Sequence, residues 1–131
     1  MVKVCFCSEE KAAPCLRLGE YNARFVSDSM DLSCVAEEDG VVLGGVNAFR
    51  LGDLVMLDRL WVEESQRGKG IGRSLLSAVE NEGKLGGAKR VELNTFGFQA
   101  PGFYEKMGYR LFGALEPAVG KWGHYFYVKE L

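Results

Sequence analysis

The sequence predicts a mixed α/β (α+β) fold in a single domain that covers residues 1–131. Three observations predict this class. The chain has the length of one domain with a core of its own. Its composition, 47% hydrophobic and 26% charged, is typical of a globular protein. Segments with the apolar spacing of strands and of helices alternate along it, with no repeat, low-complexity stretch or linker between them.

Charge and hydropathy exclude several classes of partner. The 16 basic and 18 acidic residues leave a net charge of −2, without the basic stripe of a nucleic-acid-binding domain. No apolar run approaches the ~20 residues that span a bilayer. The first residues are too few and too soon charged for a secretory signal. We therefore expect a cytoplasmic protein that binds neither nucleic acid nor membrane.

The four cysteines, Cys5, Cys7, Cys15 and Cys34, lack the C-x-x-C spacing of a zinc site, and the single histidine, His124, is far from them in sequence. A chain of this size needs no disulfides. We expect reduced cysteines, mostly buried as small hydrophobic residues, and no bound metal.

The first third of the chain predicts short elements. Residues 2–7 are β-prone, Ser8 suits the cap of a helix, and residues 21–26 suggest a second helical piece. Residues 33–37 and 41–49 are expected to form a hairpin around a glycine-bearing turn.

The rest of the chain predicts a central strand and the elements that follow it. Residues 54–62 are nearly all apolar, as expected of a strand covered on both faces. A helix should begin at the glycines that follow and end at Gly83–Gly87, with Glu80 and Lys84 as a surface pair. The remaining expected elements are a strand at 90–95, a helix at 100–107, and strands at 109–115 and 125–128.

The connection between the central strand and its helix is the most informative segment. Arg67-Gly-Lys-Gly-Ile-Gly72 has three glycines in five residues, which lets a ligand approach the backbone. The helix N–H groups that follow attract anions. The segment has neither the spacing of a P-loop nor that of a dinucleotide-binding fingerprint. It suits a pyrophosphate site, with a tight strand-to-helix connection as the structural alternative.

Two motifs together resemble the GNAT superfamily of N-acetyltransferases. Arg67-x-x-Gly70-x-Gly72, after a strand that ends in Leu60-Trp61-Val62, is similar to the family's coenzyme A pyrophosphate loop. Phe98–Tyr109 is similar to its Phe-Tyr-Glu-Lys-x-Gly-aromatic segment. The resemblance implies a central, mostly antiparallel sheet of six to seven strands, splayed between the fourth and fifth and flanked by about four helices.

The resemblance also implies acetyl-coenzyme A (acetyl-CoA) as the cofactor. Its pantetheine arm would contact the strand at Leu60, Trp61 and Val62. A backbone N–H of Leu60 or Trp61 would meet the oxyanion. Many relatives carry an asparagine at the position of Gly97, so Asn94, Gln99 or a water would replace its contact with the cofactor. The pyrophosphate would lie on the loop, at Arg67, Gly68, Lys69, Gly70, Ile71, Gly72 and Arg73.

Two residues are candidate catalytic groups. Tyr104 aligns with the tyrosine that many relatives use as general acid toward the leaving thiolate. It would act as that acid or as a hydrogen-bond anchor at the cofactor sulfur, with a core tyrosine as the alternative. Asp58 interrupts the apolar central strand where many relatives have a glutamate. It would act on the amine directly or through a water, bind the substrate, or pair with an arginine such as Arg50.

The implied reaction moves the acetyl group from acetyl-CoA to a primary amine of a small molecule or peptide, by direct attack in a ternary complex. The chain leaves no room for a separate substrate domain. Acceptor specificity would come from the N-terminal helices, the last strands or a second subunit, which leaves a homodimer open. The alternative function is a non-catalytic acyl-CoA-binding sensor or interaction module. Residues that could line the acceptor pocket are Tyr21, Asn22, Trp122, His124 and Tyr125, and those that could bind a cation are Glu20, Asp28 and Glu116.

Overall fold

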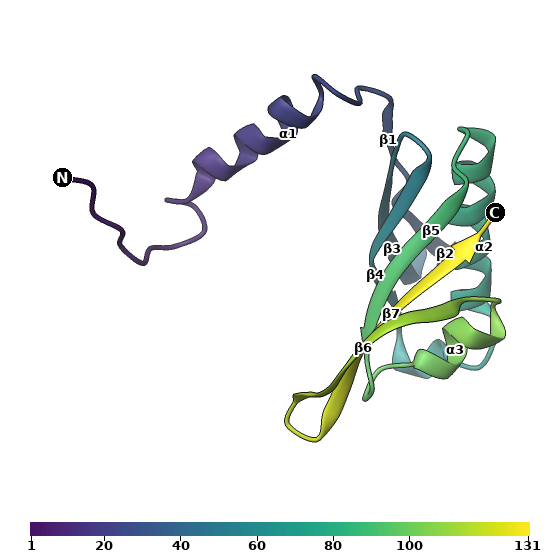
Figure 1. Cartoon of the computed structure of the whole chain (residues 1–131). Coiled ribbons are helices and arrows are strands. Elements are labelled where there is room, and N and C mark those ends of the chain that lie inside the picture. Colours follow the sequence, from purple (N-terminus) through teal and green to yellow (C-terminus); the bar gives the residue numbers. More distant parts are fainter.

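The chain forms a body with one sheet and an N-terminal arm that extends away from it (Figure 1). The computed structural model describes residues 1–131. The arm, residues 1–28, contains the 3-10 helix η1 (Ala13–Leu16) and the short helix α1 (Arg17–Asn22). None of its residues is buried. The body comprises residues 29–131.

Seven strands form the sheet, in the order β1-β3-β4-β5-β7-β6, with β2 also paired to β3. All pairs are antiparallel except β4 and β5, which are parallel. This confirms the expected mostly antiparallel sheet of six to seven strands. The strands are β1 (Ser29–Asp31), β2 (Cys34–Glu38), β3 (Val41–Leu51), β4 (Leu54–Val62), β5 (Arg90–Phe96), β6 (Arg110–Val119) and β7 (Trp122–Glu130).

The helices of the body lie on one face of the sheet (Figure 1). They are α2 (Ile71–Leu85) and α3 (Pro101–Lys106), and the short η2 (Glu64–Gln66) precedes α2. The core lies between α2 and the sheet, because Leu76 and Val79 of α2 and Val55 and Val91 of the strands are almost wholly buried. No helix has the length and hydropathy needed to span a bilayer.

Buried polar groups on this helix face are paired. Glu80 of α2 accepts a hydrogen bond from the Tyr109 hydroxyl at 2.8 Å and forms an ion pair with Lys129 at 3.1 Å. Burial and the hydrogen bond to Glu80 raise the pKa of Tyr109. The expected surface pair of Glu80 with Lys84 is therefore wrong, because Glu80 faces the sheet.

The opposite face of the sheet, which we call the open face, has no helix of the body on it (Figure 1). Because strand side chains alternate, the neighbours of the buried residues on β3, β4 and β5 point to this face. Phe49, Met56, Glu92 and Asn94 lie there, and all are half-buried or exposed. The expectation that residues 54–62 are covered on both faces is therefore wrong for this chain taken alone.

Two expectations for the N-terminal segment are also wrong. Residues 2–7 form no strand, and the helical piece expected at 21–26 is helical only at its start, because α1 ends at Asn22 and residues 23–25 form a turn. The cysteines are free, but Cys5, Cys7 and Cys15 are exposed rather than buried. Their positions in the arm explain the difference, since the arm contributes nothing to the core.

Candidate functional site

A glycine-rich loop joins the end of β4 to α2. Gly68 and Gly70 have φ angles of 78° and 83°, in the left-handed region that favours glycine. A Cβ at either position would meet no atom within 4 Å, so the loop borders free space. Gly70 caps α2 without a side-chain hydrogen bond, which leaves the first N–H groups of the helix unpaired. Such a helix start suits an anion such as pyrophosphate.

Basic side chains surround this loop. The Arg67 Nε donates to the Val62 carbonyl at 3.0 Å, and its guanidinium lies 4.5 Å from the centre of the Trp61 ring. Lys69 donates to the Gln66 side chain at 3.1 Å. Arg73, in the first turn of α2, is exposed. Arg67 thus ties the loop to β4, while Arg73 extends into solvent beside the helix start.

The parallel strands β4 and β5 separate after three pairs of residues. They pair only from Leu54 with Arg90 to Met56 with Glu92. Beyond that point β4 stays paired to β3, and β5 stays paired to β7. The facing edges of both strands are therefore unpaired, and backbone N–H and C=O groups there are free for a ligand. This is the expected splay of the fourth and fifth strands, and Leu60, Trp61 and Val62 lie along it.

Asp58 is the extra residue of a β-bulge at this separation. The register moves from Ala48 with Leu57 to Asn47 with Arg59, so no β3 residue faces Asp58. A bulge changes the direction in which the side chain of its extra residue points. The Asp58 side chain is 67% exposed and lies 3.5 Å from the Arg59 Nε. The alternative ion pair with Arg50 is wrong, because Arg50 binds Asp28 instead.

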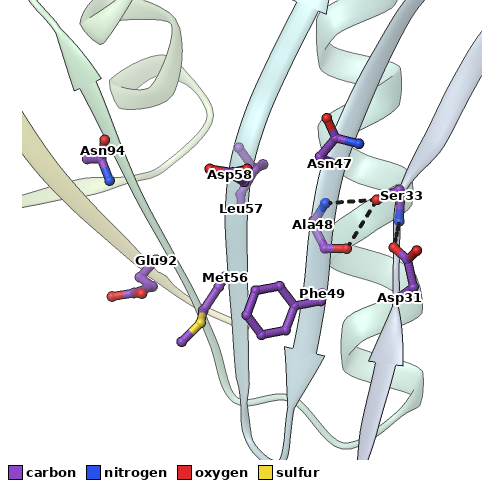
Figure 2. Close-up of a pocket in the computed structure, with 10 residues that line it drawn as sticks. All are labelled: Asp31, Ser33, Asn47, Ala48, Phe49, Met56, Leu57, Asp58, Glu92 and Asn94. Carbon is purple, nitrogen blue, oxygen red and sulfur yellow. Dashed lines mark hydrogen bonds between the residues drawn. The ribbon is translucent and has the colours of Figure 1, made fainter. Parts of the chain in front are cut away.

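Asp58 borders a hollow of about 480 Å³ on the open face (Figure 2). Three carboxylates, those of Asp31, Asp58 and Glu92, line it, and no basic side chain does. A hydrogen bond from the Ser33 N–H, at 2.9 Å, lowers the pKa of Asp31. This acidic hollow would attract a cation. Its other lining residues are Ser33, Asn47, Ala48, Phe49, Met56, Leu57 and Asn94.

Tyr104 lies in the core, in α3. Its ring is 5.1 Å from that of Phe103 and 5.8 Å from that of Tyr109. Burial raises the pKa of Tyr104 to about 12. Neither Glu80 nor Glu105, which accept hydrogen bonds from the neighbouring tyrosines, accepts one from Tyr104. Its hydroxyl is therefore not committed to a partner within the chain.

The residues expected to replace the family asparagine have partners in the chain. Asn94 Oδ1 lies 3.0 Å from His124 Nε2 on the open face. The Gln99 side-chain oxygen accepts hydrogen bonds from the Phe96 N–H at 2.7 Å and the Thr95 hydroxyl at 3.1 Å, so it holds the turn after β5. A Cβ at Gly97 would lie 3.5 Å from the rings of Trp122 and Tyr125.

The expected acceptor residues fall into two groups. Glu20, Tyr21 and Asn22 lie in the arm, which extends away from the body (Figure 1). Asp28, at the end of the arm, forms two 2.9 Å hydrogen bonds with Arg50. Trp122, His124 and Tyr125 lie in β7 and Glu116 in β6, where a hydrogen bond with Glu116 raises the pKa of Tyr125.

Sequence reasoning missed several residues of the hollow, among them Asp31, Glu92 and Met56. Glu92 is the polar residue between buried Val91 and Leu93, so strand alternation could have assigned it to the face opposite the core. Asp31 belongs to a three-residue strand that has no periodic signal of its own. No group of three or more His, Cys, Asp or Glu side chains is placed to hold a metal.

The family comparison gives the class of protein, an acetyltransferase. The model of the acetyltransferase (GNAT) domain matches residues 30–111, and the chain belongs to this family.

Three known proteins illustrate the relationship. The chain is 33% identical over 95 residues to a blasticidin-S acetyltransferase from Streptomyces morookaense. This alignment covers 72% of this chain and 70% of the relative. The crystal structure of an acetyltransferase from Bacillus cereus ATCC 14579 superposes with a TM-score of 0.84 and 29% identity, covering 99% of this chain and 98% of that one. An aminoglycoside 6'-N-acetyltransferase complexed with coenzyme A shares the fold, with a TM-score of 0.68 and 21% identity. The alignment covers 92% of this chain and 89% of that one.

Proposed function

We propose that the protein transfers the acetyl group of acetyl-CoA to a primary amine of a cationic small molecule, by direct attack in a ternary complex. The observation that carries this proposal is the acidic hollow at the point where β4 and β5 separate. Coenzyme A in the gap between these strands would present its thioester to that hollow. Three carboxylates line this hollow and no basic side chain does, so it would attract an ammonium group, which would compete with Arg59 for Asp58.

The loop would hold the cofactor. The pyrophosphate would lie on the N–H groups of Gly68–Gly72, with Arg67, Lys69 and Arg73 around it. The pantetheine arm would pair with the free edge of β4 at Leu60–Val62, as a peptide strand pairs with a sheet edge. The coenzyme A bound by the aminoglycoside acetyltransferase of the same fold supports this cofactor.

In the reaction, the amine nitrogen forms a bond to the thioester carbon, and the carbon–sulfur bond then breaks. A backbone N–H of Leu60 or Trp61 would stabilise the oxyanion. Asp58 would bind the substrate ammonium and receive its proton directly or through a water. Deprotonating a lysine-like amine costs about 4–5 kcal/mol at pH 7, so a carboxylate beside it is useful.

Tyr104 would act at the leaving sulfur. A pKa of about 12 makes full transfer of its proton to a thiolate of ordinary pKa near 8.5 uphill by about 5 kcal/mol. A hydrogen bond that Tyr104 donates to the sulfur while charge develops needs no such transfer, and the final proton can come from solvent. We therefore favour the hydrogen-bond role for Tyr104.

The test is product formation with a panel of amines. The full chain would be incubated with acetyl-CoA and, in separate reactions, blasticidin S, an aminoglycoside, a peptide with a free N-terminus, and an uncharged primary amide as a blank. Acetylated product should be followed by mass spectrometry, because three exposed cysteines would react with a thiol reagent. We expect product with the cationic small molecules. Tight binding of acetyl-CoA without product from any amine would favour the acyl-CoA sensor instead.

A further inference from the structure

The arm presents a row of apolar side chains to solvent. Large apolar residues are exposed in two stretches, from Met1 to Phe6 and from Leu16 to Val26, and Leu18 and Phe25 are 62% and 73% exposed. Its backbone hydrogen bonds from Ser8 to Val26 join only residues of the arm. A helix as short as α1 is not stable alone in water. The conformation of the arm therefore needs a partner surface that this copy of the chain does not supply.

The junction between arm and body is firmly held. Arg50, which is buried, binds both oxygens of Asp28, and the Gly52 N–H donates to the Asp28 carbonyl at 2.8 Å. From this junction the arm runs away from the sheet (Figure 1). The fixed junction directs the arm away from the open face of its own body.

A related crystal structure superposes on part of the arm as well as on the body. The 103 residues of the body, out of 131, could by themselves give a TM-score of at most 103/131, or about 0.79. The Bacillus cereus structure exceeds this value and aligns over nearly the whole chain. Part of its N-terminal segment therefore superposes on the extended arm.

The open face has the properties of a surface that needs a cover. It contains the parallel pair β4–β5, and parallel strands are normally covered on both faces. Val35, Phe49 and Met56 leave apolar surface on it, and Phe126 lies on the same side of β7. A second hollow, of about 570 Å³, adjoins the acidic one and shares Ser33 and Asn47 with it.

The arm and the open face also match in charge and size. The charged residues that line the acidic hollow are Asp31, Asp58 and Glu92. Residues 17–26 of the arm carry two basic residues, Arg17 and Arg24, against one acidic residue, Glu20, beside their apolar side chains. A stable protein–protein interface takes about 20–30 residues from each side, and the arm has 28.

We propose that two copies of this chain exchange their arms, so that the arm of each copy lies across the open face of the other. The exchange is reciprocal and closes a symmetric dimer. It also places Tyr21, Asn22 and neighbouring arm residues of one copy above the acidic hollow of the other. The last consequence, a partner-built wall of the acceptor site, rests on the proposed function; the exchange itself does not.

The first test measures molecular mass by sedimentation equilibrium over a range of concentrations. We expect the full chain to be a dimer and the arm variant L18D/F25D to be a monomer with an unchanged circular dichroism spectrum of the sheet. The matched control is L85D, because Leu85 is 81% exposed at the end of α2, on the helix side of the sheet. L85D should remain a dimer. A monomeric full chain, or a dimer that L18D/F25D leaves intact, would overturn the proposal.

The second test identifies the surface that the arm covers. The variant F49K keeps its arm but alters its open face, and it should be a monomer alone. An equimolar mixture of F49K and L18D/F25D can form one intact contact, between the arm of F49K and the unaltered face of the other variant. We expect the mixture to dimerise, with weaker affinity than the unaltered chain. If the mixture stays monomeric, the arm does not lie on the open face of a second copy. Neither test depends on acetyl transfer, so a failed acetyl-transfer assay and a failed exchange remain distinguishable.

Discussion

The two faces of the sheet differ in how they are completed. On the helix face the chain covers its own core, and the buried Glu80 has two partners from distant segments. On the open face, Phe49 and Met56 border an acidic hollow that no segment of the same chain covers. The first face is covered within one chain, and the second is left uncovered by it.

This difference separates stability from chemistry. Most of the wholly buried side chains lie between α2, α3 and the sheet. Asp58 and the free edge of β4 lie at the opening toward the other face. Substitutions on the helix face should therefore lower the free energy of unfolding, whereas substitutions at the gap and on the open face should change binding and rate.

The largest effect is expected for Glu80→Ala on the helix face. It leaves the Tyr109 hydroxyl and the Lys129 ammonium without their carboxylate partner in a largely buried place. We expect the free energy of unfolding in urea to fall by about 3 kcal/mol. Glu82→Ala, at an exposed position of the same helix, should change it by less than about 0.5 kcal/mol. Equal effects of the two substitutions would contradict a structural role for Glu80.

If Tyr104 donates a hydrogen bond to the leaving sulfur, Tyr104→Phe should lower kcat by about 100-fold and leave the affinity for acetyl-CoA nearly unchanged. The matched control is Tyr109→Phe, another buried tyrosine, which should lower stability through Glu80 but not kcat. With a pKa of about 12, Tyr104 keeps its proton, so its ionisation should cause no loss of rate up to about pH 10. An unchanged kcat in Tyr104→Phe would remove the residue from the reaction.

The sequence alone predicted the parts of the site that depend on local backbone. Gly68 and Gly70 adopt positive φ angles, which glycine favours. A strand followed by such glycines and an apolar helix predicts a tight strand-to-helix connection. Together with the second motif, these features carry the family resemblance that implies the splayed sheet, which the structure shows. The role of the loop as a pyrophosphate site stays a prediction. Most of the fold that surrounds the loop was predictable for the same reason.

The rest depends on pairing between distant segments. The bulge at Asp58 exists only relative to the register of β3, about which β4 by itself has no signal. Glu80 was assigned to Lys84 by a local spacing rule, whereas its partners lie 29 and 49 residues away in sequence. The apolar run of β4 predicted a cover on both faces. An apolar pattern indicates that a face needs cover, but not which chain provides it.

Gly70→Ala should weaken acetyl-CoA binding by about tenfold, because a methyl group at positive φ both strains the loop and occupies the space for the pyrophosphate. Gly40→Ala is the matched control. Gly40 has a φ of 78° and equally free surroundings, but it lies in the turn between β2 and β3. Both variants should lose similar stability, and only Gly70→Ala should lose affinity in calorimetric titration with coenzyme A. An equal loss of affinity in both would assign the effect to strain alone.

Asp58→Asn tests the open face. If Asp58 binds the substrate ammonium, the variant should raise KM for a cationic amine about fivefold, the size of one exposed ion pair. Asp53→Asn is the control, since Asp53 is a similarly exposed carboxylate beside a basic residue, Lys89, on the turn between β3 and β4. A large fall in kcat at constant KM would instead assign Asp58 to proton transfer, and no change in either constant would exclude it from the site.

Asp28→Asn at the junction of arm and body should have the smallest effect, because Asp28 is largely exposed. Hydrogen bonds from Arg50 hold the pKa of Asp28 below its ordinary value of 3.8. A carboxylate with a lowered pKa stabilises the folded state above its unfolded pKa, and this contribution disappears as the pH falls through the folded value. The difference in unfolding free energy between the unaltered chain and Asp28→Asn should therefore be constant from about pH 5 to 8 and decrease as the pH falls below the ordinary pKa of 3.8 and through the lower folded value. Glu37→Gln, at an exposed position without an ion pair, should show no such dependence. A difference for Asp28→Asn that does not decrease as the acid titration proceeds would mean that the junction depends on shape rather than on the charge of Asp28.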